Sequence, residues 1–543
     1  MCPNKKTVNL NQVAQKRFGY KELRSGQEEA IRSVLAGKDT LAVMPTGSGK
    51  SAIYQLAAFL IPGCTVVVSP LVALQRDQVK SIAQQDVGDA ALVNSTITAA
   101  DRQEAFEQLE DGDLEFLFLA PEQFNNPETL ERLEAAKPSL FVIDEAHCIS
   151  AWGHDFRPDY LRLGQVIEAL GHPCTLALTA TAAPPVRSEI IQRLGMKDAV
   201  TIVQGFDRPN LWLSVVQVHD DDEKQAQLLD WVIQAEKPGI VYTATRKGTE
   251  SLATLLEEHG VRSRFYHAGM KSGDRHQAEQ DFMENKVDVL VATTAFGMGI
   301  DKSNVRFVFH GDVSDSIDSY YQEIGRAGRD GEPAHITLFY NCEDLNLRRF
   351  FSGQGQVTEA QIETVVETLQ SQDDPITPRE LQEQIDLSQS KVRSALNYLA
   401  EVGVVETQPT GEVELTPSDG EDVPQAALEA QDQRRQIVRS RLEMMRNYAE
   451  VRGCRREFIL NYFGEAFAAP CNCCDNCKAG IVAEESDRQP YTIDSRVAHK
   501  SWGEGSVIRY EGDKIVILFD EVGYKTLDIQ TAILRALLRK VDP

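Results

Sequence analysis

The sequence contains no apolar run near the roughly 18 residues that a membrane-spanning helix requires, and residues 1–10 lack the apolar core of a signal peptide. It has no low-complexity tract and no short repeat. We therefore expect a protein of the cytoplasm, in a bacterium the cytoplasm or nucleoid, that binds no membrane. Its 543 residues, 42% of them hydrophobic, suffice for about three to four globular domains.

Positive charge is scarce. The 56 lysines and arginines are outnumbered by 82 aspartates and glutamates, which gives a formal net charge of −26. This balance argues against nucleic acid binding over the whole surface. A groove with its own lysines and arginines can still hold phosphates, so any nucleic-acid site must be local.

Cysteine is concentrated in one place, since five of the ten lie between Cys454 and Cys477. Such clustering is typical of a metal site in a reducing compartment rather than of a disulfide framework. Cys471, Cys474 and Cys477 have the spacing C-x₂-C-x₂-C, and Cys454 precedes them by 471 − 454 = 17 residues. Four thiolates predict a structural tetrahedral Zn²⁺ site. The alternative is a group of reduced cysteines without metal.

The segment from residue 46 to residue 51 has the composition of a phosphate-binding loop between a strand at 40–44 and a helix at 51–60. Its glycines let backbone N–H groups point at phosphate oxygens, Lys50 would meet the β- and γ-phosphates, and Ser51 would bind Mg²⁺. The strict pattern begins with glycine, where this chain has Met44, so a glycine turn that binds nothing is the alternative. The expected nucleotide-binding residues here are Thr46, Gly47, Ser48, Gly49, Lys50 and Ser51.

Asp144 and Glu145 come directly after a buried strand at 140–144, at the edge where a neighbouring phosphate loop would present its ligand. Asp144 would bind Mg²⁺ through water and Glu145 would orient or deprotonate the attacking water. An ordinary polar turn is the alternative. Further along, Arg326 and Arg329 are three residues apart and would share a face from which both reach one γ-phosphate. A solvated basic turn would explain them equally simply.

Strands alternating with helices predict an α/β fold with two parallel-sheet domains. The first, 1–205, has further strands at 65–69, 114–120 and 175–179; the second, 206–342, has strands at 239–243, 287–293 and 305–310 and no phosphate loop of its own. Ligands of such sheets bind at the carboxyl ends of the strands.

The remaining chain predicts smaller modules. Three helices and a hairpin of strands 403–407 and 412–415 suggest a winged-helix-like domain at 355–417. An acidic linker at 417–431, an arginine-rich helix at 434–456 and the cysteines follow, giving a zinc-binding helical module at 432–480. After a second linker at 481–490, strands at 505–510, 514–519 and 524–527 and a helix ending near Lys540 suggest a small β-barrel at 493–543.

Together these motifs resemble those of the RecQ-type superfamily-two DNA helicases, over about residues 18–330. The resemblance implies that the two parallel-sheet domains are RecA-like, and that family uses a phosphate loop without the first glycine. Residues 18–27 are similar to its adenine-reading motif, which implies that Tyr20 stacks on the base and that Arg24 and Gln27 contact it. Residues 148–158 are similar to its aromatic-rich loop, which couples single-stranded DNA to ATP hydrolysis, although Ala151 replaces a family glutamine. The residues expected to meet DNA are Trp152, His154, Phe156 and Arg157.

The resemblance implies an ATP-, Mg²⁺- and Zn²⁺-dependent helicase that moves 3′ to 5′ on single-stranded DNA in recombination and repair, with ATP between the two α/β halves. Single-stranded and tailed duplex DNA would be its partners. An RNA helicase of the same superfamily, and a zinc and winged-helix binding protein that uses ATP only as a switch, are the rivals. Nothing in the sequence demands more than a monomer.

Three features depart from the family or leave alternatives open. The winged-helix-like segment precedes the zinc module. Lys391 and Arg393 there either contact DNA phosphates or serve packing alone, since the glutamates of the hairpin would repel phosphates. Cys473 stands where the family usually has asparagine, so it is either a shifted zinc ligand or a spare thiol. Arg455 and Arg456 either pair with the thiolates or face DNA phosphates.

The segment 497–505 resembles the SH3-like, Tudor-like C-terminal module of superfamily-one repair helicases. This resemblance implies a protein partner such as RNA polymerase, with single-stranded-DNA-binding protein as the alternative. Trp502 within this segment is as good a core residue as a contact residue.

Overall fold

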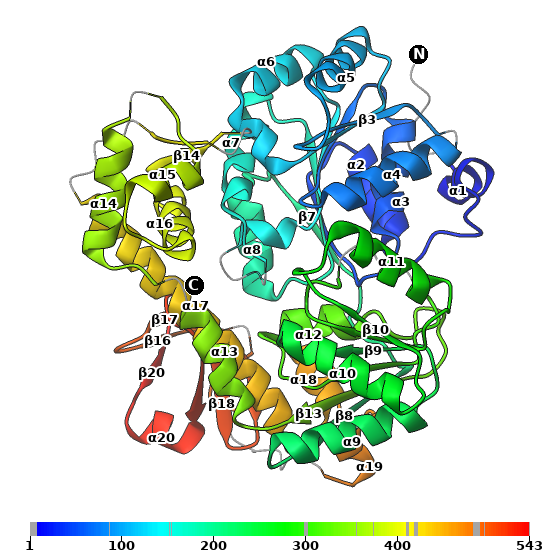
Figure 1. Cartoon of the computed structure of the whole chain (residues 1–543), viewed down its shortest axis with the longest axis vertical. Coiled ribbons are helices and arrows are strands. Elements are labelled where there is room, and N and C mark those ends of the chain that lie inside the picture. Colours follow the sequence, from blue (N-terminus) through cyan, green and yellow to red (C-terminus); the bar gives the residue numbers. More distant parts are fainter. Residues whose placement is uncertain are drawn as a thin grey trace. The chain divides into compact units, whose positions relative to one another are not determined.

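A computed structural model of the protein describes residues 8–85, 87–150, 153, 155–297, 302–353, 356–372, 374–408, 412–416, 422–481, 489–493 and 495–541 (Figure 1). The chain divides into two compact units, each made of two stretches. The first consists of Met1–Gly205 and Gln354–Asp432, and the second of Phe206–Gly353 and Gln433–Pro543. Among the residues that are described, we find no helix with the length and apolarity to cross a membrane.

The first unit contains a parallel sheet in the order β3-β4-β2-β5-β6-β1-β7. Its strands are β1 (Thr40–Val43), β2 (Thr65–Val68), β3 (Ala90–Val93), β4 (Phe116–Leu119), β5 (Leu140–Ile143), β6 (Cys174–Thr179) and β7 (Val200–Val203). The inner strands β1, β2, β4 and β5 are buried along their whole length, as in sheets covered by helices on both faces. The sequence predicted these and β6. It missed β3 and β7, which form the partly exposed edges and have weaker apolar patterns.

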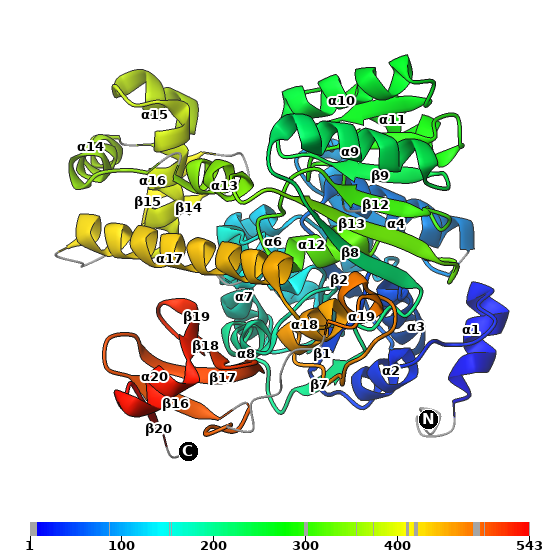
Figure 2. The ribbon, with the colours of Figure 1, turned by 90° about the horizontal axis from the view of Figure 1, so that it is seen from below.

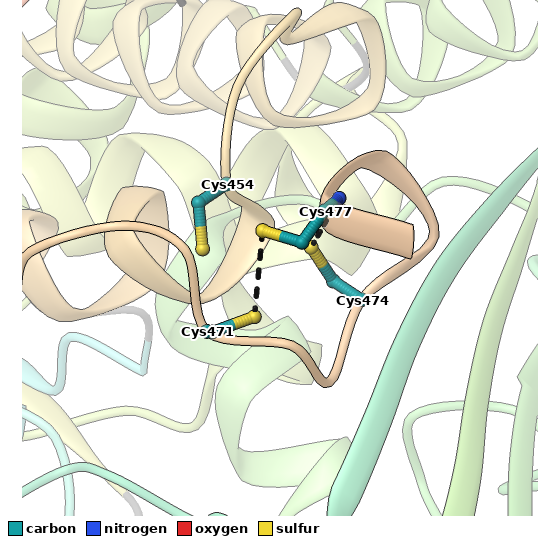
Figure 3. Close-up of side chains that lie close together, drawn as sticks. All are labelled: Cys454, Cys471, Cys474 and Cys477. Carbon is teal, nitrogen blue, oxygen red and sulfur yellow. Dashed lines mark hydrogen bonds between the residues drawn. The ribbon is translucent and has the colours of Figure 1, made fainter. Parts of the chain in front are cut away.

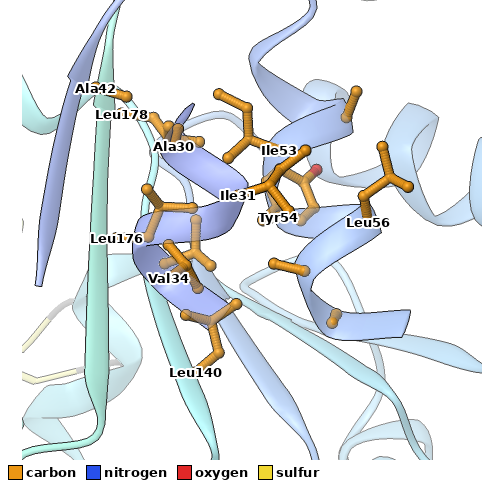
Figure 4. Close-up of a cluster of buried hydrophobic side chains, with 14 of the residues drawn as sticks. Ala30, Ile31, Val34, Ala42, Ile53, Tyr54, Leu56, Leu140, Leu176 and Leu178 are labelled. Atoms are coloured by element: carbon orange, nitrogen blue, oxygen red, sulfur yellow. The ribbon is translucent and has the colours of Figure 1, made fainter. Parts of the chain in front are cut away.

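Helices connect these strands in chain order. They are α1 (Leu10–Phe18), α2 (Gln27–Leu35), α3 (Lys50–Leu60), α4 (Val72–Gln85), α5 (Ala99–Asp111), α6 (Pro127–Ala136), α7 (Leu163–Ala169), α8 (Pro184–Arg193) and the short 3₁₀ turns η1 (Pro121–Asn125), η2 (Ala146–Ile149) and η3 (Pro158–Arg162). The core lies where α2 and α3 meet the sheet: Ile31 and Ile53 pack with Leu176 and Leu178 of β6 (Figure 4). This packing fixes both ends of the loop that joins β1 to α3.

The second stretch of this unit has α14 (Glu359–Gln370), α15 (Pro378–Gln384), α16 (Gln389–Glu401) and an antiparallel hairpin of β14 (Val405–Thr407) and β15 (Val413–Leu415). These are the predicted helices and strands of the winged-helix-like segment. They share an apolar core in which Leu381 and Leu399 are buried. Lys391 donates a hydrogen bond to Gln361 Oε1 at 3.2 Å.

The second unit contains another parallel sheet, in the order β10-β11-β9-β12-β13-β8. The strands are β8 (Leu211–Gln217), β9 (Gly239–Tyr242), β10 (Ser263–Tyr266), β11 (Val289–Ala292), β12 (Phe307–His310) and β13 (Ala334–Tyr340), and the helices are α9 (Asp221–Gln234), α10 (Arg246–Glu258), α11 (Ser272–Met283), α12 (Ile317–Ile324) and α13 (Asp344–Gly353). The predicted α/β class with two parallel sheets is therefore confirmed. The sequence found β9, β11 and β12 and missed the other strands.

The predicted linker at 417–431 is wrong for its last nine residues, 423–431, which begin α17 (Val423–Glu450). Pro424 lies in the first turn, where the missing N–H breaks no helical hydrogen bond. Gln431 is buried and bonds both the N–H and the carbonyl of Val357, at 2.8 and 3.0 Å. These contacts hold residues 423–431 in the helix, although the acidic composition of the segment 417–431 is typical of a linker. Residues 417–421 lie outside the described part of the chain, as do 482–488 of the second predicted linker.

The predicted arginine-rich helix at 434–456 is also wrong at its end, because α17 stops at Glu450 and a separate helix, α18 (Arg455–Tyr462), follows. Cys454 is the N-cap of α18, and its sulfur accepts a hydrogen bond from Glu457 N at 3.4 Å. The short helix α19 (Asp475–Lys478) closes the cysteine segment.

The C-terminal part is an antiparallel sheet in the order β19-β18-β17-β16-β20 (Figure 2, red). Its elements are β16 (Arg496–His499), β17 (Gly503–Glu511), β18 (Lys514–Phe519), β19 (Gly523–Asp528), α20 (Ile529–Leu534) and β20 (Leu538–Lys540). The predicted helix to Lys540 is wrong, since α20 ends at Leu534 and β20 pairs with β16. Trp502 packs against the core of this sheet. The SH3-like assignment stays a prediction.

Candidate nucleotide, DNA and zinc sites

The loop between β1 and α3 has the backbone that a phosphate-binding turn requires. Gly47 and Gly49 have positive φ angles of 80° and 79°, a region that side chains disfavour, and Gly49 caps the N-terminus of α3. The N–H groups of the first helical turn and the dipole at this helix end favour an anion. Ser48 Oγ is buried and has no hydrogen-bond partner among the described residues. The loop therefore fits a phosphate group in both charge and hydrogen-bonding capacity.

Gln27 holds this loop from α2. Its Nε2 donates to the carbonyl oxygens of Ser48 and Gly49 at 2.9 and 3.0 Å, and its Oε1 accepts from the backbone N of Arg24 at 2.8 Å. The Arg24 guanidinium also donates to the carbonyl of Gly47. The expected base-reading residues and the phosphate loop are thus one hydrogen-bonded group. Their predicted contacts to adenine, and the stacking of Tyr20, stay predictions.

Asp144 and Glu145 follow β5 at the same edge of the sheet. The register pairs Val43 of β1 with Thr179 of β6, and Ile143 of β5 with Ala177 of β6. The expectation that β5 neighbours the loop-bearing strand is wrong in this detail, because β6 lies between them. Burial raises the pKa of Asp144 to about 7; the negative charge of Glu145 adds to the rise, and Lys50 opposes it. A cation bound beside this buried carboxyl group would stabilise its ionised form.

His147, which follows β5, contacts Thr179 at the end of the neighbouring strand β6. His147 Nδ1 lies 2.9 Å from Thr179 Oγ1 and 3.3 Å from Glu145 Oε2. Thr179 Oγ1 in turn donates to the carbonyl of Thr181 at 3.1 Å. Glu145 itself has a left-handed backbone, with φ 49°. Sequence reasoning singled out Glu145 but gave His147 and Thr179 no role of their own.

The aromatic-rich loop is tied to this edge by two side chains. Arg157 bonds Asp155 Oδ2 through Nε and Nη2, at 3.2 and 3.0 Å, and donates from Nη1 to the carbonyl of Pro70 at 3.1 Å. The hydroxyl of Tyr160, which sequence reasoning missed, donates to the carbonyl of Asp144 at 3.0 Å. Trp152 and His154 lie outside the described residues. The contacts of Phe156 and Arg157 with DNA stay predictions.

Arg326 and Arg329 belong to the second unit and follow α12. Arg326 is buried and donates to the carbonyl of Gly297, while Arg329 Nε donates to the carbonyl of Gly325 at 3.3 Å. The two guanidinium groups are therefore held by backbone carbonyls within their own unit. This is not the fully solvated basic turn that the sequence left as the alternative.

The four predicted zinc ligands come together (Figure 3). The sulfur atoms of Cys454, Cys471, Cys474 and Cys477 all lie within 4.8 Å of one another. The distance between Cys471 Sγ and Cys477 Sγ is 3.9 Å, and a tetrahedral Zn–S site requires about 3.8 Å between sulfurs. The donor set and its geometry fit Zn²⁺.

Cys473 is not a member of this group, so the four cysteines of the predicted ligand register come together without it. Its backbone instead bonds the sheet: the carbonyl accepts from Leu213 N of β8 at 3.1 Å. Two residues on, Asp475 Oδ2 accepts from Val215 N at 2.9 Å. The cysteine segment thus covers the open edge of β8, which would otherwise expose unpaired backbone groups.

Both alternatives for Arg455 and Arg456 are wrong. Arg455 pairs with Asp475 at 2.6 Å and Arg456 with Asp207 at 2.5 Å, and both side chains are buried. Arg456 also donates to the carbonyl of Leu211 at 2.7 Å. Neither guanidinium faces solvent, so neither is placed for DNA phosphates. Arg456 anchors the zinc module to the segment that begins β8, and Arg455 joins α17 and α19 within the module.

Comparison with known families gives three matches along the chain. Residues 24–189 match the DEAD/DEAH box helicase family, residues 223–331 the helicase conserved C-terminal domain, and residues 417–478 the RecQ zinc-binding family.

Among individual proteins, a probable ATP-dependent DNA helicase RecS of Bacillus subtilis is 36% identical over 474 residues, 87% of this chain and 92% of the relative. The ATP-dependent DNA helicase RecQ of Haemophilus influenzae is 35% identical over 460 residues, and the chain spans 62% of its length. Among solved structures, the DUF1998 helicase MrfA bound to DNA aligns with 78% of this chain and 64% of its own at a TM-score of 0.53 and 17% identity, which shows a shared fold.

Proposed function

This chain belongs to the RecQ family of ATP-dependent DNA helicases, and we propose that it couples ATP hydrolysis to 3′-to-5′ movement on single-stranded DNA and to the opening of duplexes in recombination and repair. One observation carries the proposal. The phosphate loop, the Asp144–Glu145 pair and the base of the aromatic-rich loop occupy one edge of one sheet, and hydrogen bonds connect the last two.

The nucleotide half of the proposal assigns roles to side chains. Lys50 and the backbone of residues 46–51 bind the phosphates, and Ser51 and Asp144 are the groups that would hold Mg²⁺. The metal would neutralise phosphate charge and leave the protein to position the reacting groups. Glu145 takes the proton of the attacking water. His147 contacts Glu145 directly and is itself held in place by Thr179.

Arg326 and Arg329 complete the catalytic group in this proposal. A positive charge beside the γ-phosphoryl group stabilises the negative charge of the transition state as the bond to the leaving oxygen breaks. One such arginine raises turnover by roughly 10³ to 10⁵. Their carbonyl contacts support the assignment, because a preorganised guanidinium needs little rearrangement at the moment of reaction.

Coupling to DNA would pass through the aromatic-rich loop. Trp152 and Phe156 offer faces on which bases stack, and His154 and Arg157 offer polar contacts to the strand. A strand bound there would move residues 148–158. Tyr160 and Arg157 would carry the movement to the carbonyls of Asp144 and Pro70, which follow the ends of strands β5 and β2.

The zinc module has a structural role in the proposal. Zn²⁺ would hold four thiolates that cannot otherwise lie so close without repulsion. The segment that they stabilise covers β8 and carries Asp475, the partner of Arg455.

We further propose that the protein acts as a monomer in the cytoplasm or nucleoid, on single-stranded and tailed duplex DNA. The C-terminal sheet would receive a protein partner, either RNA polymerase or single-stranded-DNA-binding protein. Domain bounds of 1–205, 206–342, 355–417, 432–480 and 493–543 belong to the same proposal. Binding of each purified partner to the chain with and without residues 493–543 would test this role.

Two comparisons test the activity against its rivals. ATP hydrolysis is measured with poly-deoxyribonucleotide and with poly-ribonucleotide strands, and displacement is measured on duplexes with a 3′ or a 5′ tail. We expect stimulation by the deoxy strand and displacement from the 3′ tail. Stronger stimulation by the ribo strand would favour an RNA helicase. Binding of DNA without displacement would favour a binding protein that uses ATP as a switch.

A further inference from the structure

The C-terminal sheet packs against the zinc module and α17 within the second unit (Figure 2). A register shift between Val507 and Arg509 interrupts β17, and the Arg509 side chain lies against α18. There the buried guanidinium carbon lies 4.0 Å from the ring centre of Phe458. Such a buried cation–π contact indicates a packed interface.

Tyr524 of β19 makes the second contact of this interface. Its backbone N donates to Ser440 Oγ of α17 at 2.5 Å, and its ring centre lies 5.5 Å from that of Tyr462, the last residue of α18. Both tyrosines and Ser440 are buried. The C-terminal sheet therefore sets the position of Tyr462 from one side.

Tyr462 reaches in the other direction to α12. Its hydroxyl donates to Asp318 Oδ2 at 2.5 Å, and the Asp318 side chain is only 2% exposed. Burial raises the pKa of Asp318, while the charge of Arg441 and the Tyr462 hydrogen bond act the other way. Removing the hydroxyl that donates to a buried carboxylate leaves the carboxylate without that hydrogen bond, which lowers the stability of the folded state.

Asp318 lies in the first turn of α12, the helix that leads directly to Arg326 and Arg329. Two more contacts hold this helix to the same module. The hydroxyls of Tyr320 and Tyr448 lie 3.1 Å apart, and the ring centres of Tyr321 and Phe463 lie 4.9 Å apart. Because α12 is one short helix, a displacement of its first turn would also move its C-terminal end, which Arg326 and Arg329 follow.

We propose that Tyr462 is a positioning residue for Arg326 and Arg329, and that Tyr524 makes the C-terminal sheet part of the support that keeps these arginines in place for ATP hydrolysis. The inference rests on the proposed role of the arginines. It gives the C-terminal sheet a function in catalysis besides any partner that it binds. A partner that shifts the sheet would then change the rate of hydrolysis.

The test uses the full-length, zinc-loaded chain and two substitutions. Tyr462→Phe removes the hydroxyl and keeps the ring; Tyr524→Ala removes the ring and keeps the backbone bond to Ser440. Tyr510→Phe is the matched control, because its hydroxyl donates to the Tyr491 carbonyl at 2.7 Å inside the same sheet. DNA-stimulated ATP hydrolysis is measured together with zinc content and the unfolding temperature.

We expect Tyr462→Phe and Tyr524→Ala to lower kcat about threefold to tenfold with an unchanged KM for ATP, because only the transition state needs the arginines in place. Tyr510→Phe should retain the rate, because the hydroxyl that it removes bonds only within the C-terminal sheet. Adding Tyr462→Phe to Asp318→Asn should cause no further loss if the two side chains act through their shared hydrogen bond.

Arg329→Ala, assayed beside these variants, separates the two proposals. If Arg329→Ala is inactive while Tyr462→Phe and Tyr524→Ala hydrolyse ATP like the unaltered chain, the positioning role is overturned and the proposed function stands. If Arg329→Ala retains full turnover, the arginine assignment itself is wrong, and the positioning role is lost with it.

Discussion

The hydroxyl of Tyr160 donates to the backbone carbonyl of Asp144 over 3.0 Å, and so joins the turn after the aromatic-rich loop to the backbone of the expected metal-binding residue. Both residues lie in the first unit, and Tyr160 is fully buried. The bond offers a short path by which DNA on the loop would act on ATP hydrolysis.

Tyr160→Phe should weaken this path. We expect ATP hydrolysis without DNA to be retained and the stimulation by single-stranded DNA to fall by about fivefold, the loss of one buried hydrogen bond. Tyr491→Phe is the control, since it removes a hydroxyl that donates to the Leu538 carbonyl, also at 3.0 Å, in the C-terminal sheet. Equal stimulation of both variants would exclude the path.

Gln27→Ala should weaken nucleotide binding. It removes both hydrogen bonds that hold the carbonyls of Ser48 and Gly49, so the phosphate loop loses its preorganised backbone. We expect the Kd for a fluorescent ATP analogue to rise about tenfold, the effect of roughly 1.4 kcal/mol. Gln103→Ala, which removes an exposed amide that bonds Glu107 on α5, is the control. An unchanged Kd for Gln27→Ala would mean that the loop needs no such support.

Metal analysis should return about one zinc per chain, as expected for a single four-thiolate site. Cys474→Ser should lose the metal and lower the unfolding temperature, because Cys474 is buried in the group of ligands. Cys473→Ser should keep full zinc content. Loss of zinc from Cys473→Ser alone would show that the ligand register is shifted.

Arg456→Ala should destabilise the second unit. It leaves the half-buried Asp207 carboxylate without its partner and frees the carbonyl of Leu211, so the loss should lie above that of an exposed pair and below the roughly 3–5 kcal/mol of a fully buried one. Arg446→Ala removes an exposed pair with Glu450 and should cost about 0–1 kcal/mol. Urea unfolding of both variants measures the difference. Equal losses would contradict the anchoring role of Arg456.

Local patterns predicted those parts of the fold in which burial dictates composition. The inner strands β1, β2, β4 and β5 are short and fully apolar, and each was found from the sequence. The edge strands β3 and β7 are partly exposed, so their composition carries a weaker signal. Strand β13 is almost entirely buried and was still missed, and we have no physical account of that miss.

The sites divide in a similar way. The spacing of the cysteines in the sequence indicated the four zinc ligands, because short intervals between cysteines are typical of a tetrahedral site with four thiolates. The contacts of Tyr160, Tyr462 and Arg456 depend on residues 16, 144 and 249 positions away, so no local pattern contains them. The helical start of α17 was not predicted from the sequence, because few of its residues are buried and the acidic composition of the segment 417–431 resembles that of a linker.

Displacement of a labelled strand from a duplex with a 3′ single-stranded tail, in ATP and Mg²⁺, tests the central claim most directly. Lys50→Ala is the matched control, because it removes the charge that is expected to meet the phosphates. We predict that the unaltered chain releases the strand and that the Lys50→Ala chain does not. Equal release by both chains, or no release by either while DNA-stimulated ATP hydrolysis persists, would contradict the account of this protein as a helicase.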